Sequence, residues 1–227
     1  MPSVVFTQVK ITASFCAQLC FIKQDTNKKL KIMSANKTLI IETSAAANTA
    51  RELRKLYFIR VAFSVTWVLL VALLAKTSYT AAVVLLVIYP LWDVVGTFLD
   101  IRANKGNGTS LTPQYVNVAI SIVTTLTVGF AITKGVPAAL IVFGAWALLT
   151  GLIQLVLGLK RRKEFGGQWP MILSGGQSML AGVSFIAMAH SPNMGIVNLA
   201  GYSAFGAFYY LLAAIRLGKS AKAVGQK

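Results

Sequence analysis

The sequence predicts an all-α membrane protein, a polytopic bundle of six transmembrane helices. Of its 227 residues 56% are apolar and only 12% are charged, about half the charged share of an ordinary soluble domain. The mean hydropathy of +0.68 agrees with a chain that lies mostly in a lipid bilayer. These properties exclude a disordered chain and argue against a soluble enzyme.

Six apolar stretches reach the length of a membrane span, about 20 residues or about 30 Å of helix. They are residues 57–75, 81–101, 115–133, 138–159, 169–189 and 196–217. A transmembrane β-barrel would instead require segments of alternating polarity, and residues 140–149 do not alternate. We therefore predict helices for all six stretches.

The segment before the first span has a different composition. Residues 1–50 are predicted to form a polar, basic cytoplasmic tail without a cleavable signal, so the first spanning helix is expected to direct insertion. Met33 offers a second start, which would make residues 1–32 an optional extension. Cys16 and Cys20 lack His or acidic companions, so we expect reduced thiols and no metal site.

Short breaks separate the predicted helices. Turn residues occur at 76–78, 106–109, 134–137, 166–167 and 191–193. Helices joined by such short connections are expected to be antiparallel neighbours. Residues 51–219 are therefore predicted to form one membrane domain of three tandem antiparallel hairpins, followed by a basic cytoplasmic tail at residues 220–227.

The formal net charge of +16 is distributed unevenly over the predicted loops. Of the 22 Lys and Arg residues, only Lys76 and Lys134 fall on one side of the predicted bundle. Because basic loops remain in the cytoplasm, we expect both termini to be cytoplasmic in a bacterial inner (plasma) membrane. The excess charge predicts contact with anionic lipid at the cytoplasmic face. We expect no nucleic-acid partner, because no base-reading motif accompanies the charge.

Aromatic residues reveal an internal repeat. The pair Tyr89 and Trp92 recurs as Phe143 and Trp146, and again as Tyr202 and Phe205. Gln114-Tyr115 likewise recurs as Gln168-Trp169. The repeats have the same predicted orientation, unlike the inverted repeats common in alternating-access transporters.

Glycines recur at a spacing of seven in two of the predicted helices. They are Gly144, Gly151 and Gly158 in the fourth helix and Gly175 and Gly182 in the fifth. Small residues allow close approach of helices in lipid, so we expect these glycines to pack helix against helix. A glycine-lined pore is the alternative.

The chain resembles the HdeD-like family of acid-resistance membrane proteins in three places. These are the run Phe143-Gly144-Ala145-Trp146-Ala147-Leu148-Leu149-Thr150-Gly151, the basic loop at residues 160–163, and Trp169 leading into Leu173-Ser174-Gly175. The resemblance covers roughly residues 51–219. It implies a six-helix inner-membrane protein associated with acid stress and supplies no catalytic residues. The acidic segment Tyr89-Pro90-Leu91-Trp92-Asp93 departs from the family pattern.

Asp93 is the best candidate for a functional residue, because a carboxylate deep in a membrane is costly unless it is paired, hydrated or protonated. It lies about 10 Å deeper in the predicted helix than Asp100. Counting from the helix ends places polar side chains of other helices at the same depth. We therefore predict an intramembrane polar site of Asp93, Tyr89, Thr97, Ser121, Gln154 and Gln177. Asp93 either fixes helix register by hydrogen bonding or binds a proton or cation.

Arg60 and Asp100 occupy matching depths in the first predicted hairpin. We expect a structural ion pair between these two residues.

Two functional hypotheses follow. The first is a non-catalytic inner-membrane protein of the HdeD-like type that supports acid or envelope stress tolerance. The second is a small proton or cation transporter or channel that uses Asp93. We expect no enzymatic activity and no cofactor, because no nucleophile with an adjacent base and no phosphate-binding glycine loop is present. The partner, besides lipid, is either another copy of the chain or a different membrane protein.

Overall fold

The computed structural model describes residues 3–105, 110–165 and 168–224. Within them the chain forms α-helices, one 3-10 helix and no β-strand, which confirms the predicted all-α class. The elements are α1 (Ser3–Leu74), α2 (Tyr79–Asn104), α3 (Thr112–Ala131), η1 (Ile132–Lys134), α4 (Val136–Phe165), α5 (Trp169–Ala187) and α6 (Asn198–Val224). Predicted features outside the described residues are the turns at 106–109 and 166–167, the thiols of Cys16 and Cys20, and residues 225–227.

The chain divides into two compact units, Met1–Ala45 and Ala46–Lys227. In the first unit the described residues belong to α1, and the side chains of residues 27–39 are exposed. This helix begins at Ser3, whereas the sequence predicted a tail up to residue 50. The physical reason is that Ser3–Leu74 contains neither Gly nor Pro, the residues that most disfavour a helix interior.

Five described helices are long and apolar enough to cross a membrane. The candidate spans are Ala47–Leu74, Tyr79–Asn104, Thr112–Lys134, Val136–Lys163 and Trp169–Ala187. The chain is therefore a multi-pass membrane protein. The predicted sixth span falls on α6, which is less apolar because it carries several tyrosines, glycines and serines.

Two helix ends differ from the sequence prediction in ways that matter for the site. Helix α2 begins before residue 81, because the Ser78 hydroxyl caps it by accepting a hydrogen bond from the Ala81 amide at 3.2 Å. Helix α4 continues past residue 159 to Phe165. Lys and Arg are good helix formers, and their charge is favourable near a helix C-terminus. Residue Arg161 therefore lies on a helix and not in a loop.

Within the second unit, glycines bring the backbones of α4 and α5 together. A Cβ atom added to Gly144 would lie 2.7 Å from the carbonyl oxygen of Gly182. A Cβ atom added to Gly175 would lie 2.8 Å from the carbonyl oxygen of Gly151. Any side chain at these positions would collide with the facing backbone. The predicted packing role of these glycines is therefore confirmed.

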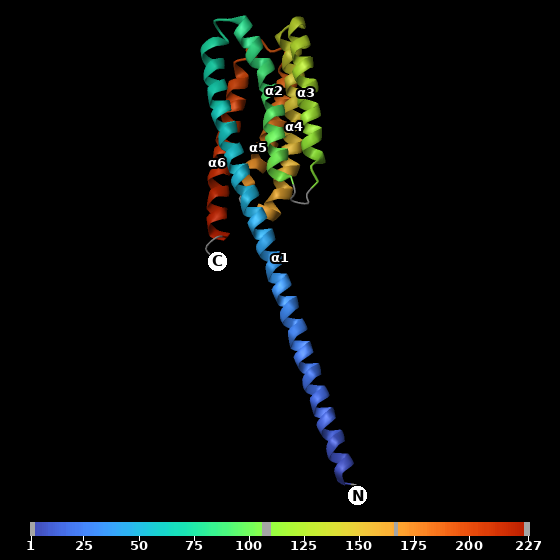
Figure 1. Cartoon of the computed structure of the whole chain (residues 1–227). Helices are drawn as coiled ribbons and strands as arrows, with labels where there is room; N and C mark the ends of the chain where they lie inside the picture. Colours follow the sequence, from blue (N-terminus) through green and yellow to red (C-terminus); the bar gives the residue numbers. More distant parts are fainter. Residues whose placement is uncertain (1–2, 106–109, 166–167, 225–227) are drawn as a thin grey trace. The chain divides into compact units, whose positions relative to one another are not determined.

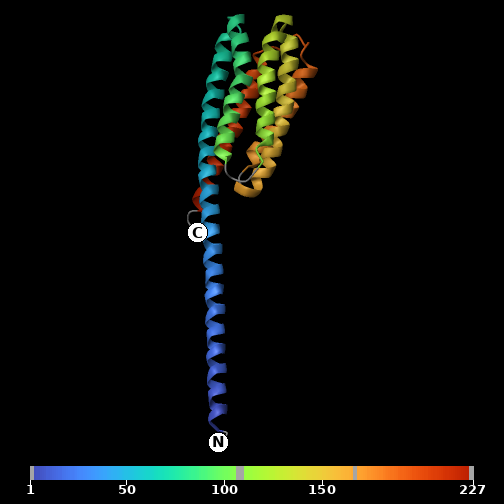
Figure 2. The ribbon, with the colours of Figure 1, turned by 45° about the vertical axis from the view of Figure 1, so that its right-hand side comes forward.

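The helices α2 to α6 run alternately in opposite directions, and α2, α3 and α4 lie side by side in both views (Figures 1 and 2). We call the end of the bundle where α2 and α4 finish and α3 and α5 begin the basic end. It carries Arg102, Lys105, residues 160–163 and Arg216, whereas the opposite end carries Lys76 and Lys134.

The two halves of the bundle differ in composition. The opposite half holds the larger apolar cluster, which includes the fully buried Leu86, Val128 and Leu140 and is drawn from all of the spanning helices. In the basic half a smaller cluster joins α1 to α6 through Leu53 and Leu217. A third small apolar cluster of Val94, Ile101 and Val118 lies between α2 and α3. Polar side chains, among them Thr97, Asp100, Asn117 and Ser121, are buried in the same half, so the candidate site lies there.

Candidate functional site

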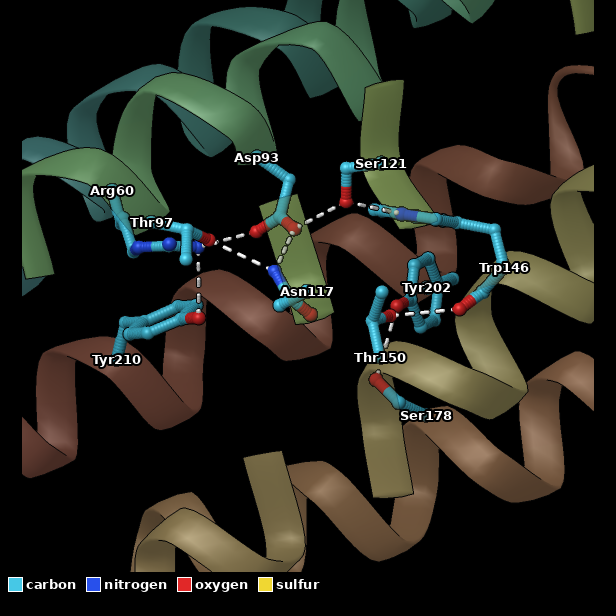
Figure 3. Close-up of polar contacts among 10 residues, drawn as sticks. All are labelled: Arg60, Asp93, Thr97, Asn117, Ser121, Trp146, Thr150, Ser178, Tyr202 and Tyr210. Atoms are coloured by element: carbon cyan, nitrogen blue, oxygen red, sulfur yellow. Dashed lines mark hydrogen bonds and ion pairs between the residues drawn. The ribbon is translucent and has the colours of Figure 1, made fainter. Parts of the chain in front are cut away.

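A partly buried ion pair links α1 to α2. The Nη1 atom of Arg60 lies 2.9 Å from Oδ1 of Asp93, and the two side chains are 12% and 15% exposed. The same nitrogen donates a hydrogen bond to the Tyr210 hydroxyl of α6 at 3.1 Å (Figure 3). The Arg60 guanidinium also lies over the ring of Tyr210, 5.3 Å from its centroid. The pair therefore connects three helices.

The second oxygen of Asp93 is bound by α3. Its Oδ2 atom accepts hydrogen bonds from Asn117 Nδ2 at 2.7 Å and from the Ser121 hydroxyl at 2.9 Å (Figure 3). Asn117 also donates to Thr97 Oγ1 at 2.8 Å, and Ser121 accepts from Trp146 Nε1 of α4 at 2.9 Å. The network thus joins five helices, and both Asp93 oxygens have donors.

A second ion pair lies nearer the basic end. Asp100 Oδ2 is 2.5 Å from Arg161 Nη2, and each side chain is 10% exposed. The predicted pair between Arg60 and Asp100 is therefore wrong. Arg60 binds the deeper Asp93, and the extension of α4 brings Arg161 to Asp100.

The structure divides the predicted polar site into two groups. Thr97 and Ser121 belong to the Asp93 network. Tyr89, Gln154 and Gln177 line the pocket around it, with no hydrogen bond to Asp93 among the described contacts. Sequence reasoning missed four members of the network, namely Arg60 as the partner of Asp93, Asn117, Trp146 and Tyr210. The aromatic repeat was the available signal for Trp146, because Trp146 is the counterpart of Trp92 in the next hairpin.

A pocket lined by polar and aromatic side chains extends from the basic end to this network. Its cavity volume is about 110 Å³, which is room for several water molecules. Both ion pairs line it, together with the amides Gln114, Gln154, Gln168 and Gln177 and the rings of Tyr57, Tyr89, Trp92, Trp146, Tyr202 and Tyr210. The pocket can therefore hold a small hydrogen-bonding ligand. Within the described residues no group of three or more His, Cys, Asp or Glu side chains comes together.

Three rings that the repeat makes equivalent meet at the inner end of this pocket. The ring centroids of Tyr89 and Phe143 are 5.8 Å apart, those of Phe143 and Tyr202 are 6.1 Å apart, and those of Tyr89 and Tyr202 are 6.4 Å apart. Tyr202 is fixed further by a 3.0 Å hydrogen bond between its hydroxyl and that of Ser178 (Figure 3). We call these three rings the aromatic triad. Tyr89 and Tyr202 line the pocket and pack against the apolar cluster of the opposite half, to which Phe143 belongs.

Gly96 provides the space for the Arg60 side chain. A Cβ atom at Gly96 would lie 2.7 Å from both Cζ and Nη2 of Arg60. We expect Gly96→Ala to destabilise the protein by about 1–2 kcal/mol, because the displaced guanidinium loses bonds to Asp93 and Tyr210. Thermal unfolding in detergent measures this effect. Gly129→Ala is the control, since a Cβ there meets nothing within 4 Å, and an unchanged melting temperature for Gly96→Ala would contradict the expectation.

Comparison with known proteins gives one match. A family model described as a short repeat of unknown function (DUF308) matches residues 119–187. No curated protein and no solved structure matches the chain. The chain is thus similar to this short repeat over the segment from the middle of α3 to the end of α5, which includes the glycine contact between α4 and α5.

Proposed function

We propose that the chain is a non-catalytic membrane protein of the HdeD-like type that acts by binding and not by moving ions. The contacts of the Asp93 carboxylate are the observation that supports this proposal. Its charge is balanced by Arg60, and its second oxygen accepts hydrogen bonds from Asn117 and Ser121. Because both carboxylate oxygens already have donors from three side chains, few lone pairs of Asp93 remain free to coordinate a cation. Asp93 then serves to fix the positions of the helices.

The proposed physiological role is tolerance of acid or envelope stress. The support for this role is the resemblance to the HdeD-like family at residues 143–151, 160–163 and 169–175. The match to the short repeat covers the same region, residues 119–187. The proposed partners are anionic lipids at the cytoplasmic face and either further copies of the chain or another membrane protein.

The proposed topology has six spans in three tandem hairpins, with both termini in the cytoplasm of a bacterium. The distribution of Lys and Arg supports it, because only Lys76 and Lys134 lie at the end opposite the basic end. The alternating direction of α2 to α6 is in keeping with this arrangement.

A proton or cation transporter is the second candidate. The observation that favours it is the position of the pocket, which is lined by Arg161 and Gln168 of the basic end and by Asp93, while an apolar cluster fills the opposite half. Access from one side with a closed opposite half is the geometry of a transporter in one of its two states.

Flux measurements in proteoliposomes separate the two candidates. We expect the wild-type protein and Asp93→Asn, at equal amounts of folded protein, to give no proton or monovalent-cation flux above that of empty liposomes after a pH step. The control is Glu52→Gln, which removes an exposed carboxylate paired with Lys55. Wild-type flux that is lost in folded Asp93→Asn and kept in Glu52→Gln would overturn the binding proposal and identify a transporter.

A further inference from the structure

A positively charged basin adjoins the outer end of the pocket. Its lining residues are Asn104, Ser110, Gln114, Leu157, Leu159, Lys160, Arg161 and Lys163. Three of them, Gln114, Leu157 and Arg161, also line the inner pocket, so the two spaces are neighbours. Among the described residues that line this basin, none is acidic. Such an arrangement concentrates anions at the entrance.

A buried hydrogen-bond donor without a partner lies at the same entrance. Gln168 is 1% exposed, and its Nε2 atom has no hydrogen-bond partner. Gln168 precedes the first turn of α5, yet its side chain does not cap that helix. Its Oε1 atom instead accepts a 3.5 Å hydrogen bond from the Tyr57 hydroxyl. Buried donors are rarely left unpaired, so this amide indicates an acceptor that binds from outside the protein.

Arg161 adds further donors beside this amide. Its Nη2 atom binds Asp100, and its guanidinium also interacts with the Tyr57 hydroxyl. A guanidinium has five N–H donors in a planar fork that suits the oxygens of a phosphate or carboxylate. Arg161, Gln168 and Tyr57 line the same pocket. Asp100 offsets the charge of Arg161 alone, which leaves Lys160 and Lys163 to attract an anion.

Two neighbouring features favour negative charge at this place. Helices α3 and α5 both begin at the basic end, and the N-terminus of a helix carries free N–H groups and a partial positive charge.

We propose that the entrance of the pocket is a binding site for a phosphate-type oxyanion. Arg161, Gln168 and the Tyr57 hydroxyl bind its oxygens, and Lys160 and Lys163 draw it into the basin. The phosphate belongs either to a free phosphate compound or to the headgroup of a phospholipid, since both offer the same oxygens. With a free phosphate compound as ligand the site goes beyond the proposed function, and with a phospholipid headgroup it rests on the lipid partner of that function and gives it a specific place.

The test uses the full chain in nanodiscs and has two arms. In the first, inorganic phosphate is titrated into protein held in phosphatidylcholine nanodiscs, and binding is measured by calorimetry. In the second, native mass spectrometry counts phosphatidylglycerol molecules retained from mixed nanodiscs. We expect Gln168→Leu to weaken binding about tenfold, because a charge-assisted hydrogen bond is lost. Gln24→Leu is the control, since it makes the same change at an exposed position of the first unit.

Each outcome decides the proposal. Weaker phosphate binding in Gln168→Leu supports the site with a free phosphate compound as its ligand, and weaker lipid retention alone supports it with a phospholipid headgroup. Arg161→Lys keeps the positive charge and serves as the second variant if Gln168→Leu does not fold. Equal binding of wild type and the folded variant in both arms, or no binding by the wild type in either arm, overturns the proposal.

Discussion

Gly182→Ala should destabilise the protein by about 3 kcal/mol, at the upper end of the range for overpacking. A Cβ atom at Gly182 would lie 2.5 Å from the carbonyl oxygen of Gly144 and 2.6 Å from the amide nitrogen of Leu148. Both atoms belong to the backbone of α4, so no side-chain rotation can relieve the collision. The two helices must separate, and the contact along the rest of the glycine stripe weakens with them.

Gly176 provides a matched control on the same helix. A Cβ atom there meets nothing within 4 Å, so Gly176→Ala should be neutral or stabilise the helix by up to about 1 kcal/mol. Unfolding of the detergent-solubilised protein, followed by tryptophan fluorescence, measures both variants. Equal stability of Gly182→Ala and Gly176→Ala would show that the α4 and α5 backbones are not in contact.

Asp93→Leu should destabilise the protein by about 3 kcal/mol, because it leaves the partly buried Arg60 charge without its carboxylate partner. The variant also removes the acceptor of Asn117 and Ser121, whose hydrogen bonds connect α3 to this site. The expected loss of stability is thus larger than the loss on removing a carboxylate from an exposed ion pair, which is at most about 1 kcal/mol. The loss is measured as the free energy of unfolding of Asp93→Leu relative to the wild-type protein. The same measurement is made on Arg60→Met and on the variant that carries both changes.

The double variant Arg60→Met with Asp93→Leu is the control for charge. Replacing both members of a buried pair by apolar residues removes the unpaired charge, so part of the stability should return. The matched measurement on Asp100 and Arg161 should show the same pattern, since that pair is equally enclosed. If the double variant is as unstable as the sum of the single variants, the charges of Arg60 and Asp93 do not act as a pair.

The sequence predicted the fold class well because a bilayer imposes a simple rule. Apolar stretches of spanning length become helices, and the described helices cover all six predicted stretches with shifted ends. The prediction failed at the ends of the helices. Residues 1–50 were predicted as a polar tail, and the absence of Gly and Pro allows this tail to be helical from Ser3 onward. The basic residues 160–163 were read as a loop, although Lys and Arg favour helices.

The sequence predicted how deep the candidate site lies in the membrane, but it did not predict the contacts within the site. Counting residues from the helix ends placed Ser121 at the level of Asp93, and the two are hydrogen-bonded. The same count paired Arg60 with Asp100, because it compared Cα positions and ignored the length of the Arg side chain. Arg60 instead binds Asp93, and Gly96 gives its guanidinium room to do so. Such choices depend on how the helices rotate about their axes, which spacing along the chain does not determine.

The backbone contact between α4 and α5 also limits how this protein can change over evolutionary time. Where Gly144, Gly151, Gly175 and Gly182 meet the facing helix, any side chain would collide, so we expect selection to remove nearly every substitution there. We expect residues that face lipid to accept most apolar replacements. The matched repeat at residues 119–187 contains this contact. Sequence similarity between related proteins of this kind should therefore persist longest where the backbones of two helices are in contact.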